Sequence, residues 1–168
     1  DGGLGADSLR GGSGNDYFVV TAGDTVDGGD GYDIVTASVD VDLSATQFTS
    51  VEEVVLTGSA DQATADDDGS VLKAADGNHS TLVGGDAGDT LIGADGDDSL
   101  NGAGANDSLS GFDGDDTLNG GSGADTMVGG DGDDVYIIDS ASDLVVEALG
   151  TTASLSFTQS YVDQVETY

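Results

Sequence analysis

The sequence contains no cysteine, no proline and almost no positive charge. Without cysteine, neither disulfides nor thiolate metal sites can form. Arg10 and Lys73 are the two cationic residues, and His79 is the single histidine. Zinc sites, which need histidine or cysteine, are therefore not expected. A conventional nucleophile–base pair is nearly excluded for the same reason, so we expect no catalytic residues and no enzyme activity of this chain.

Long apolar runs are also missing. No segment approaches the roughly 20 apolar residues that a transmembrane helix needs, and the first three residues, Asp-Gly-Gly, are not a signal peptide. The formal net charge of −32 disfavours contact with nucleic acid and with anionic lipid. We therefore expect no nucleic-acid partner and no membrane insertion.

Aspartate and glycine are abundant. Of 168 residues, 34 are acidic and 29 are glycine, and the only glutamates are Glu52, Glu53, Glu147 and Glu166. High net charge with low hydrophobicity is typical of disorder, and we expect the metal-free chain to be expanded. Disordered acidic tails favour glutamate, however, whereas aspartate is a turn residue and a short ligand for hard cations. The composition therefore favours cation binding over solubility alone.

A nine-residue period runs through much of the chain. Glycine recurs at Gly84, Gly93, Gly102, Gly111, Gly120 and Gly129. Aspartate recurs at Asp89, Asp98, Asp107, Asp116, Asp125, Asp134 and Asp143. Bulky apolar residues recur at Leu82, Leu91, Leu100, Leu109, Leu118, Met127, Tyr136 and Val145. Three residue classes that keep one period indicate a repeat architecture.

Clear copies of the repeat occupy residues 2–10, 11–19, 28–36, 111–119 and 120–128. They follow the pattern G-G-x-G-x-D-x-U-x, in which U is bulky and apolar, with Phe112 in place of the second glycine in the copy at 111–119. This pattern resembles the RTX (haemolysin-type calcium-binding) repeats of type I-secreted bacterial proteins. The resemblance implies calcium ions as the cofactor and a secreted or cell-surface location.

The residue types of the nonapeptide explain the expected fold. Glycine readily adopts the positive φ angles of a tight turn, and the last three residues, x-U-x, form a short strand with U pointing inward. Alternate repeats then lie on opposite sides of a flattened coil. We therefore predict an all-β fold, a right-handed parallel β-roll (β-solenoid) of nonapeptide repeats with intervening β-rich segments. The dipeptides Asn101-Gly102 and Asn119-Gly120 also suit hairpin turns, but antiparallel hairpins do not require glycine and aspartate every nine residues.

The period divides the chain into four segments. They are a first calcium-binding repeat block (1–36), an intervening strand and loop segment (37–83), a second calcium-binding repeat block (84–145) and flanking strands that begin a next unit (146–168). Within the second segment, apolar patterning predicts strands at 39–43 and 51–58, and polar composition predicts a loop at 61–69.

Aspartates two repeats apart are expected on the same side of the coil, about 4.8 Å from one another. Carboxylates at that distance repel unless they share a cation or a proton, and calcium takes six to eight oxygen ligands in flexible geometry. The predicted ligands are Asp7, Asp16, Asp24, Asp33, Asp89, Asp98, Asp107, Asp116, Asp125, Asp134 and Asp143. The family resemblance adds backbone carbonyls near Gly12, Gly14, Gly29, Gly31, Gly96, Gly114, Gly121, Gly123, Gly130 and Gly132.

Some sites depart from the pattern. Alanine replaces turn glycines at Ala87, Ala94, Ala103 and Ala105, which predicts weaker or distorted sites. Segment 20–27 is one residue short, so Asp24 is the least regular ligand. The additional acids are expected to face solvent; they are Asp86, Asp95, Asp97, Asp113, Asp115, Asp131 and Asp133. An EF-hand is excluded because no glutamate closes a twelve-residue loop from Asp113 or Asp131.

These features lead to one main functional hypothesis and two alternatives. We expect a calcium-binding structural module of a large extracellular bacterial protein, of adhesin, surface-layer or filament type, which folds on calcium binding after secretion. The first alternative is an auxiliary C-terminal repeat region of a secreted hydrolase, protease or toxin. The second is an ice- or carbohydrate-binding face, for which the outward row of Ser99, Ser108, Thr117 and Thr126 is short.

The expected partners are calcium and copies of the chain, or adjoining repeats, in end-to-end contact. Neither end resembles a polar capping repeat, and the chain enters directly into a repeat, as a segment of a longer protein would. Residues 16–20 also recur as residues 134–138, 118 positions later. This similarity fits either two generic block endings or a larger unit repeated along the polypeptide.

Overall fold

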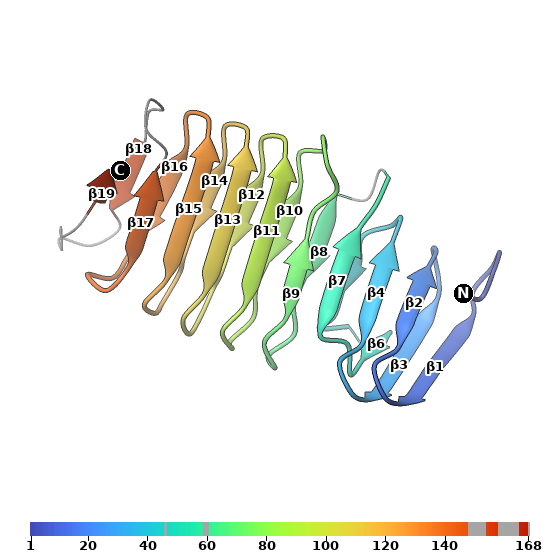
Figure 1. Cartoon of the computed structure of the whole chain (residues 1–168). Helices are drawn as coiled ribbons and strands as arrows, with labels where there is room; N and C mark the ends of the chain where they lie inside the picture. The colour runs from blue at the N-terminus through green and yellow to red at the C-terminus, as the bar shows by residue number, and fades with distance from the viewer. Residues whose placement is uncertain (46, 59–60, 148–153, 158–164, 168) are drawn as a thin grey trace.

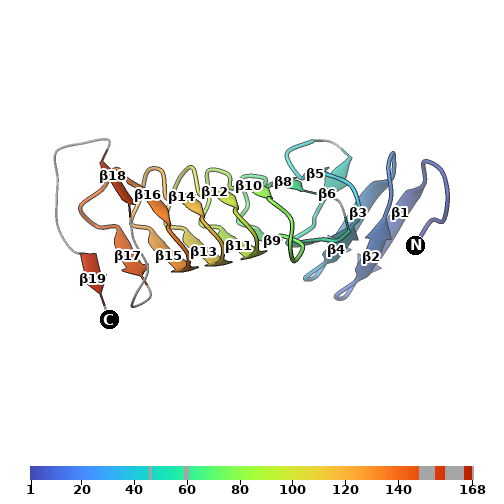
Figure 2. The ribbon, with the colours of Figure 1, turned by 90° about the horizontal axis from the view of Figure 1, so that it is seen from above.

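The chain forms a right-handed coil of about eight turns, in which strands alternate between two facing layers. The computed structural model describes residues 1–45, 47–58, 61–147, 154–157 and 165–167. Figure 1 shows the coil from the side, and Figure 2 shows its two layers from above. No helix that could cross a membrane occurs among these residues.

Three sheets make up the described part of the chain. The largest has nine strands: β2 (Tyr17–Val20), β4 (Ile34–Ala37), β7 (Glu53–Leu56), β9 (Val71–Lys73), β11 (Thr90–Asp95), β13 (Ser108–Asp113), β15 (Thr126–Asp131), β17 (Leu144–Glu147) and β19 (Val165–Thr167). Opposite it lie β5 (Val41–Asp42), β8 (Gln62–Thr64), β10 (Thr81–Val83), β12 (Ser99–Asn101), β14 (Thr117–Asn119), β16 (Val135–Ile138) and β18 (Ser154–Phe157). A short third sheet contains β1 (Ser8–Ser13), β3 (Thr25–Asp30) and β6 (Phe48–Thr49).

Every pairing between these strands is parallel. In the second block, each pair joins residues 18 positions apart, as in Leu91 with Leu109. The predicted parallel β-solenoid is therefore confirmed, and antiparallel hairpins are excluded for the described strands.

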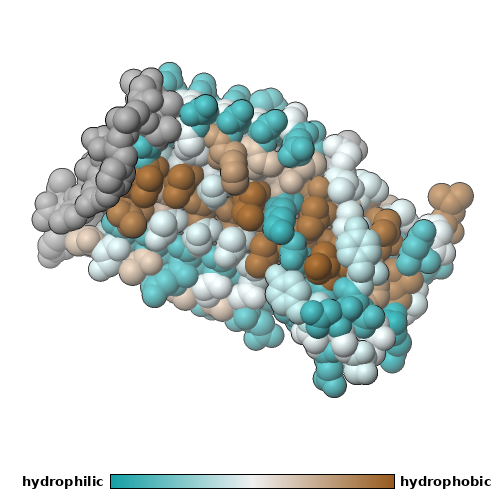
Figure 3. All heavy atoms as spheres, in the orientation of Figure 1, coloured by the Kyte–Doolittle hydropathy of each residue, from teal (hydrophilic) through white to brown (hydrophobic). Residues whose placement is uncertain are grey.

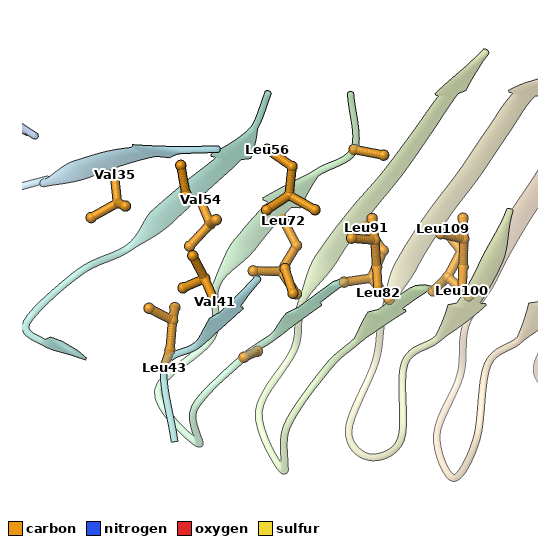
Figure 4. Packing of buried hydrophobic residues seen from close by; sticks show 14 of the residues in the cluster. Val35, Val41, Leu43, Val54, Leu56, Leu72, Leu82, Leu91, Leu100 and Leu109 are labelled. Atoms are coloured by element: carbon orange, nitrogen blue, oxygen red, sulfur yellow. The ribbon is translucent and has the colours of Figure 1, made fainter. Parts of the chain in front are cut away.

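The core consists of two columns of apolar side chains between the layers. One column is Leu82, Leu100, Leu118 and Tyr136, and the other is Leu91, Leu109, Met127 and Val145. All eight side chains are at most 1% exposed, and Figure 4 shows several of them meeting across the coil. Complete burial of one leucine side chain stabilises the folded state by about 1.5–3 kcal/mol. One repeat cannot bury its own apolar residue, so the core depends on stacking.

The intervening segment continues both layers, and it corrects one prediction. Residues 61–69 were expected to form a loop, yet Gln62–Thr64 forms a strand that pairs with Thr81–Val83. Ala63 points inward and is 1% exposed beneath Leu82. The pairing partner above the strand, and not the apolar pattern of the segment itself, imposes the extended backbone.

A polar link crosses the core near the end of the second block. The hydroxyl group of Tyr136 donates a hydrogen bond to the Glu147 carboxylate and accepts one from the backbone N–H of Gly129 at 2.8 Å. Tyr136 lies on β16 and Glu147 on β17, so the bond joins the two layers. Burial, together with the bond to Glu147, raises the pKa of Tyr136.

Candidate metal centre

The predicted aspartates lie in ladders along the turns. Each directly precedes a strand. In all of them except Asp7 and Asp16, Oδ1 accepts a hydrogen bond from the backbone N–H of the matching residue one coil earlier. On one edge, Asp98 N–H donates to Asp116 at 2.7 Å, and Asp116 N–H donates to Asp134 at 2.9 Å. The other edge carries Asp89, Asp107, Asp125 and Asp143, and the first block carries the pairs Asp16–Asp33 and Asp7–Asp24. The structure therefore brings together the pairs expected from the nine-residue period.

The second carboxylate oxygen of most of these aspartates is buried and has no hydrogen-bond partner. This holds for the Oδ2 atoms of Asp7, Asp16, Asp33, Asp98, Asp107, Asp116, Asp125 and Asp134. A buried acceptor without a partner costs about 1–3 kcal/mol. Eight such atoms in similar surroundings indicate that the turns are built for a positively charged partner.

Backbone carbonyls face these oxygens. A Cβ atom on Gly111 would collide with both Asp116 Oδ2 and the carbonyl oxygen of Gly129, so two acceptors converge there. The same convergence joins Asp107 Oδ2 with the Gly120 carbonyl at Gly102. Oxygen acceptors that meet without a donor fit calcium, which binds carboxylate and carbonyl oxygens at about 2.3–2.6 Å.

The carbonyls of the first glycine in each repeat were missed by sequence reasoning. The sequence predicts carbonyl ligands near the later turn glycines, and the carbonyl oxygens of Gly12, Gly14, Gly96 and Gly114 do point at the next turn. The first glycines lack side chains because the carboxylate of their own repeat fills that space. The sequence contains a signal for these carbonyls, namely the first glycine that recurs every nine residues. It recurs because a Cβ atom at that position would collide with the carboxylate.

Three aspartates differ from the others because both of their oxygens already accept hydrogen bonds. They are Asp24, Asp89 and Asp143. Their Oδ2 atoms bond the N–H groups of Thr21, Gly85 and Ser140 at 2.8, 2.7 and 3.1 Å. The bond from the Thr21 backbone is the main cause that lowers the pKa of Asp24. These carboxylates have less capacity for a metal ion than the eight with an unpartnered oxygen.

Burial makes the central carboxylates poor anions in the absence of a cation. It raises the pKa of Asp98 and of Asp107 from 3.8 to about 6, and that of Asp116 to about 7. Burial also raises the pKa values of Asp89, Asp125 and Asp134. For Asp116, the charges of Asp134 and Asp98 add to this effect. A bound cation would offset both effects, because an opposite charge nearby favours the ionised carboxylate.

We expect the metal-free fold to lose stability as the pH rises. Carboxyls whose pKa is raised from 3.8 to about 6–7 bind more protons in the folded chain than in the unfolded one. Their stabilising contribution is complete below the unfolded pKa and is lost as the pH passes the folded pKa. Thermal unfolding in chelator should therefore show a Tm that falls from about pH 5, until the unfolding transition is lost towards about pH 8. A Tm that rises across this window would contradict the assignment of these buried carboxyls.

The additional acids are exposed, as expected. Asp95, Asp113 and Asp131 form a row of paired residues at the ends of adjacent strands. Asp97, Asp115 and Asp133 form a second row, in which each Oδ1 of Asp97 and Asp115 accepts a backbone N–H from the next turn. Figure 3 shows hydrophilic residues along both long edges of the coil, over the turns.

Side chains alone do not form a metal site in the described residues. No group of three or more histidine, cysteine, aspartate or glutamate side chains is positioned to hold an ion there. His79 is exposed, and its Nδ1 lies 3.7 Å from the carboxylate of Asp97. Any ion in the ladders must therefore take main-chain oxygens, as the convergence at Gly111 suggests.

A parallel β-solenoid whose stacked turns pair buried carboxylates with backbone carbonyls defines a class, the calcium-binding β-roll. A family model of the RTX calcium-binding nonapeptide repeat matches residues 1–24, 75–109 and 110–145, with four copies of the repeat. Because these residues exceed half of the sequence, the chain belongs to the RTX calcium-binding nonapeptide repeat family. No curated protein sequence matches it.

Membership confirms two predictions from the sequence. Repeats of this family bind several calcium ions, and they form structural calcium-binding modules of type I-secreted proteins. The aspartate and carbonyl ligands of individual ions remain predictions, which the ladder geometry supports. Asp33 lies outside the matched residues.

Proposed function

We propose that this chain is a calcium-stiffened structural module of a large extracellular protein, of adhesin, surface-layer or filament type, and that it carries no catalytic activity. The observation that supports this proposal is the set of eight buried, unpartnered carboxylate oxygens along the turns. An ion at each would join one coil to the next, so binding and stiffening would be the same event. Such a chain would be expanded where calcium is scarce and folded outside the cell, where calcium is abundant.

End-to-end association is the second part of the proposal. Among the described residues, β1 and β2 each pair on one side only, and unpaired strand edges are templates for further pairing. Leu4, Tyr17 and Val19 lie near this open end and are 102%, 63% and 42% exposed. These features suit contact with adjoining repeats or with another copy of the chain.

The similarity between residues 16–20 and 134–138 does not by itself define a unit that is repeated by simple translation along the coil axis. Its first copy includes β2 in the nine-stranded sheet, whereas its second copy includes β16 in the opposite sheet. A unit of this length would therefore need a half-turn about the coil axis to continue the solenoid.

Association should depend on calcium. With calcium, the charge repulsion between copies of net charge −32 is reduced, and we expect light scattering and electron microscopy to show oligomers or fibres that disappear in chelator. A folded, monodisperse monomer in calcium would contradict this part of the proposal. That result would favour the auxiliary repeat region of a secreted hydrolase, protease or toxin.

A further inference from the structure

A glutamate takes the aspartate position where the first block meets the intervening segment. Glu52 directly precedes β7, and the register of β7 on β4 aligns it with Asp33. The backbone N–H of Asp33 donates to Glu52 Oε2 at 2.6 Å. One coil earlier, Asp16 N–H donates the equivalent hydrogen bond to Asp33 Oδ1 at 2.8 Å. Glu52 therefore continues the ladder of the first block although it belongs to no nonapeptide.

The space between these two coils has the same acceptors as the sites of the second block. Asp33 is 0% exposed, and its Oδ2 has no hydrogen-bond partner. A Cβ atom on Gly28 would collide with both Asp33 Oδ2 and the carbonyl oxygen of Ser50. The carbonyl of Ser50 therefore occupies the same place beside Gly28 as the carbonyl of Gly129 occupies beside Gly111.

The coils of this ladder differ in length. Glu52 follows Asp33 by 19 positions, whereas Asp33 follows Asp16 by 17. A coil of 19 residues accepts either acid, because Asp89 also lies 19 positions after its partner Ser70. In the coil after Glu52, Ser70 takes the position of the acid, and its backbone N–H donates a hydrogen bond to Asp89 Oδ1. Glu52 is therefore the last carboxylate of the first ladder.

We propose that Asp33, Glu52 and the carbonyl of Ser50 bind a calcium ion at the edge of the first block, with Glu52 and Ser50 outside the nonapeptide repeats. This inference rests on the calcium-binding function proposed above. The ion joins the turn of the first block to the first turn of the intervening segment, where the family match is absent. It extends the calcium-linked part of the coil beyond the recognisable repeats.

Glu53 provides a matched control. It neighbours Glu52 in sequence but pairs with Lys73 Nζ at 2.6 Å and accepts a hydrogen bond from Tyr32 at 3.1 Å. The substitutions Glu52→Gln and Glu53→Gln remove the same charge from adjacent positions. Only the first replaces a carboxylate at the Asp33 site.

The test counts bound ions by native mass spectrometry and measures affinities by calorimetry, with circular dichroism in calcium to verify folding. We expect E52Q to lose one ion, or to bind one ion at least tenfold more weakly, while E53Q keeps the wild-type number. E52D keeps the carboxylate, so it should retain the fold and bind this ion more tightly than E52Q does. Wild-type stoichiometry and affinity in E52Q, or an equal loss in E53Q, would overturn the site. A wild-type chain that binds no calcium would instead overturn the proposed function.

Discussion

In chelator at neutral pH, the chain is expected to lose most of its β-structure, and calcium is expected to restore it. The metal-free fold must contain eight buried acceptor oxygens without partners, each at a cost of about 1–3 kcal/mol. The net charge of −32 adds repulsion between stacked turns. Together these costs match or exceed the about 5–15 kcal/mol by which ordinary domains are stable.

Calcium reverses this balance through binding to the folded state alone. When the free calcium concentration is 100 times the Kd of a site, binding at that site stabilises the fold by about 2.7 kcal/mol, and the contributions of several sites add. Far-ultraviolet circular dichroism in calcium, in magnesium and in chelator measures the effect. Magnesium should restore much less structure, because it requires tighter octahedral geometry. A chain that is equally structured in chelator would contradict the account, and so would complete replacement of calcium by magnesium.

Asp116→Asn is expected to act in opposite directions with and without calcium. Asn Oδ1 can still accept the hydrogen bond from Asp98 N–H, but an NH₂ donor replaces Oδ2 where the site needs an acceptor. In calcium, the sites towards Asp98 and towards Asp134 should each weaken at least tenfold, or by about 1.4 kcal/mol. In chelator near pH 5, where a metal-free fold remains, the variant should have a Tm at least as high as the wild type and should keep it as the pH rises, because it no longer buries a carboxylate whose pKa is about 7.

Asp113→Asn is the matched control for this prediction. Asp113 is exposed, and it lies beside Asp95 and Asp131 in a row of like charges. Its neutralisation should leave calcium stoichiometry unchanged and stabilise the chain slightly in both conditions, because like charges on paired strands are destabilising. Calorimetric titration and thermal unfolding compare the two variants. Equal calcium affinity in both would show that the buried ladder does not bind the ions.

The period alone was sufficient to predict the architecture of the repeat blocks. A bulky residue every nine positions predicted both core columns, because only the middle residue of each strand points inward. It predicted that Leu100 stacks on Leu82 and that Asp116 stacks on Asp98, as the structure shows. Periodic stacking transfers directly from sequence to space, so no knowledge of loop conformation was needed.

The intervening segment was predicted less well because its coils differ in length. Ala63 fills an interior position that leucine fills elsewhere, and its polar neighbours concealed the strand. Glu52 was assigned to a strand, although it occupies the ladder position in front of one. Both errors have one cause: once the spacing varies, register depends on the neighbouring coil, which the local sequence does not contain.

We predict that calcium ions lie between stacked turns at the unpartnered aspartate oxygens. The most direct test is X-ray diffraction from crystals grown in calcium, recorded at a wavelength with calcium anomalous signal. The account predicts peaks about 2.3–2.6 Å from the Oδ2 atoms of Asp98, Asp107, Asp116 and Asp125. A structure without peaks at these oxygens, or with peaks only along the exposed row of Asp95, Asp113 and Asp131, would contradict it.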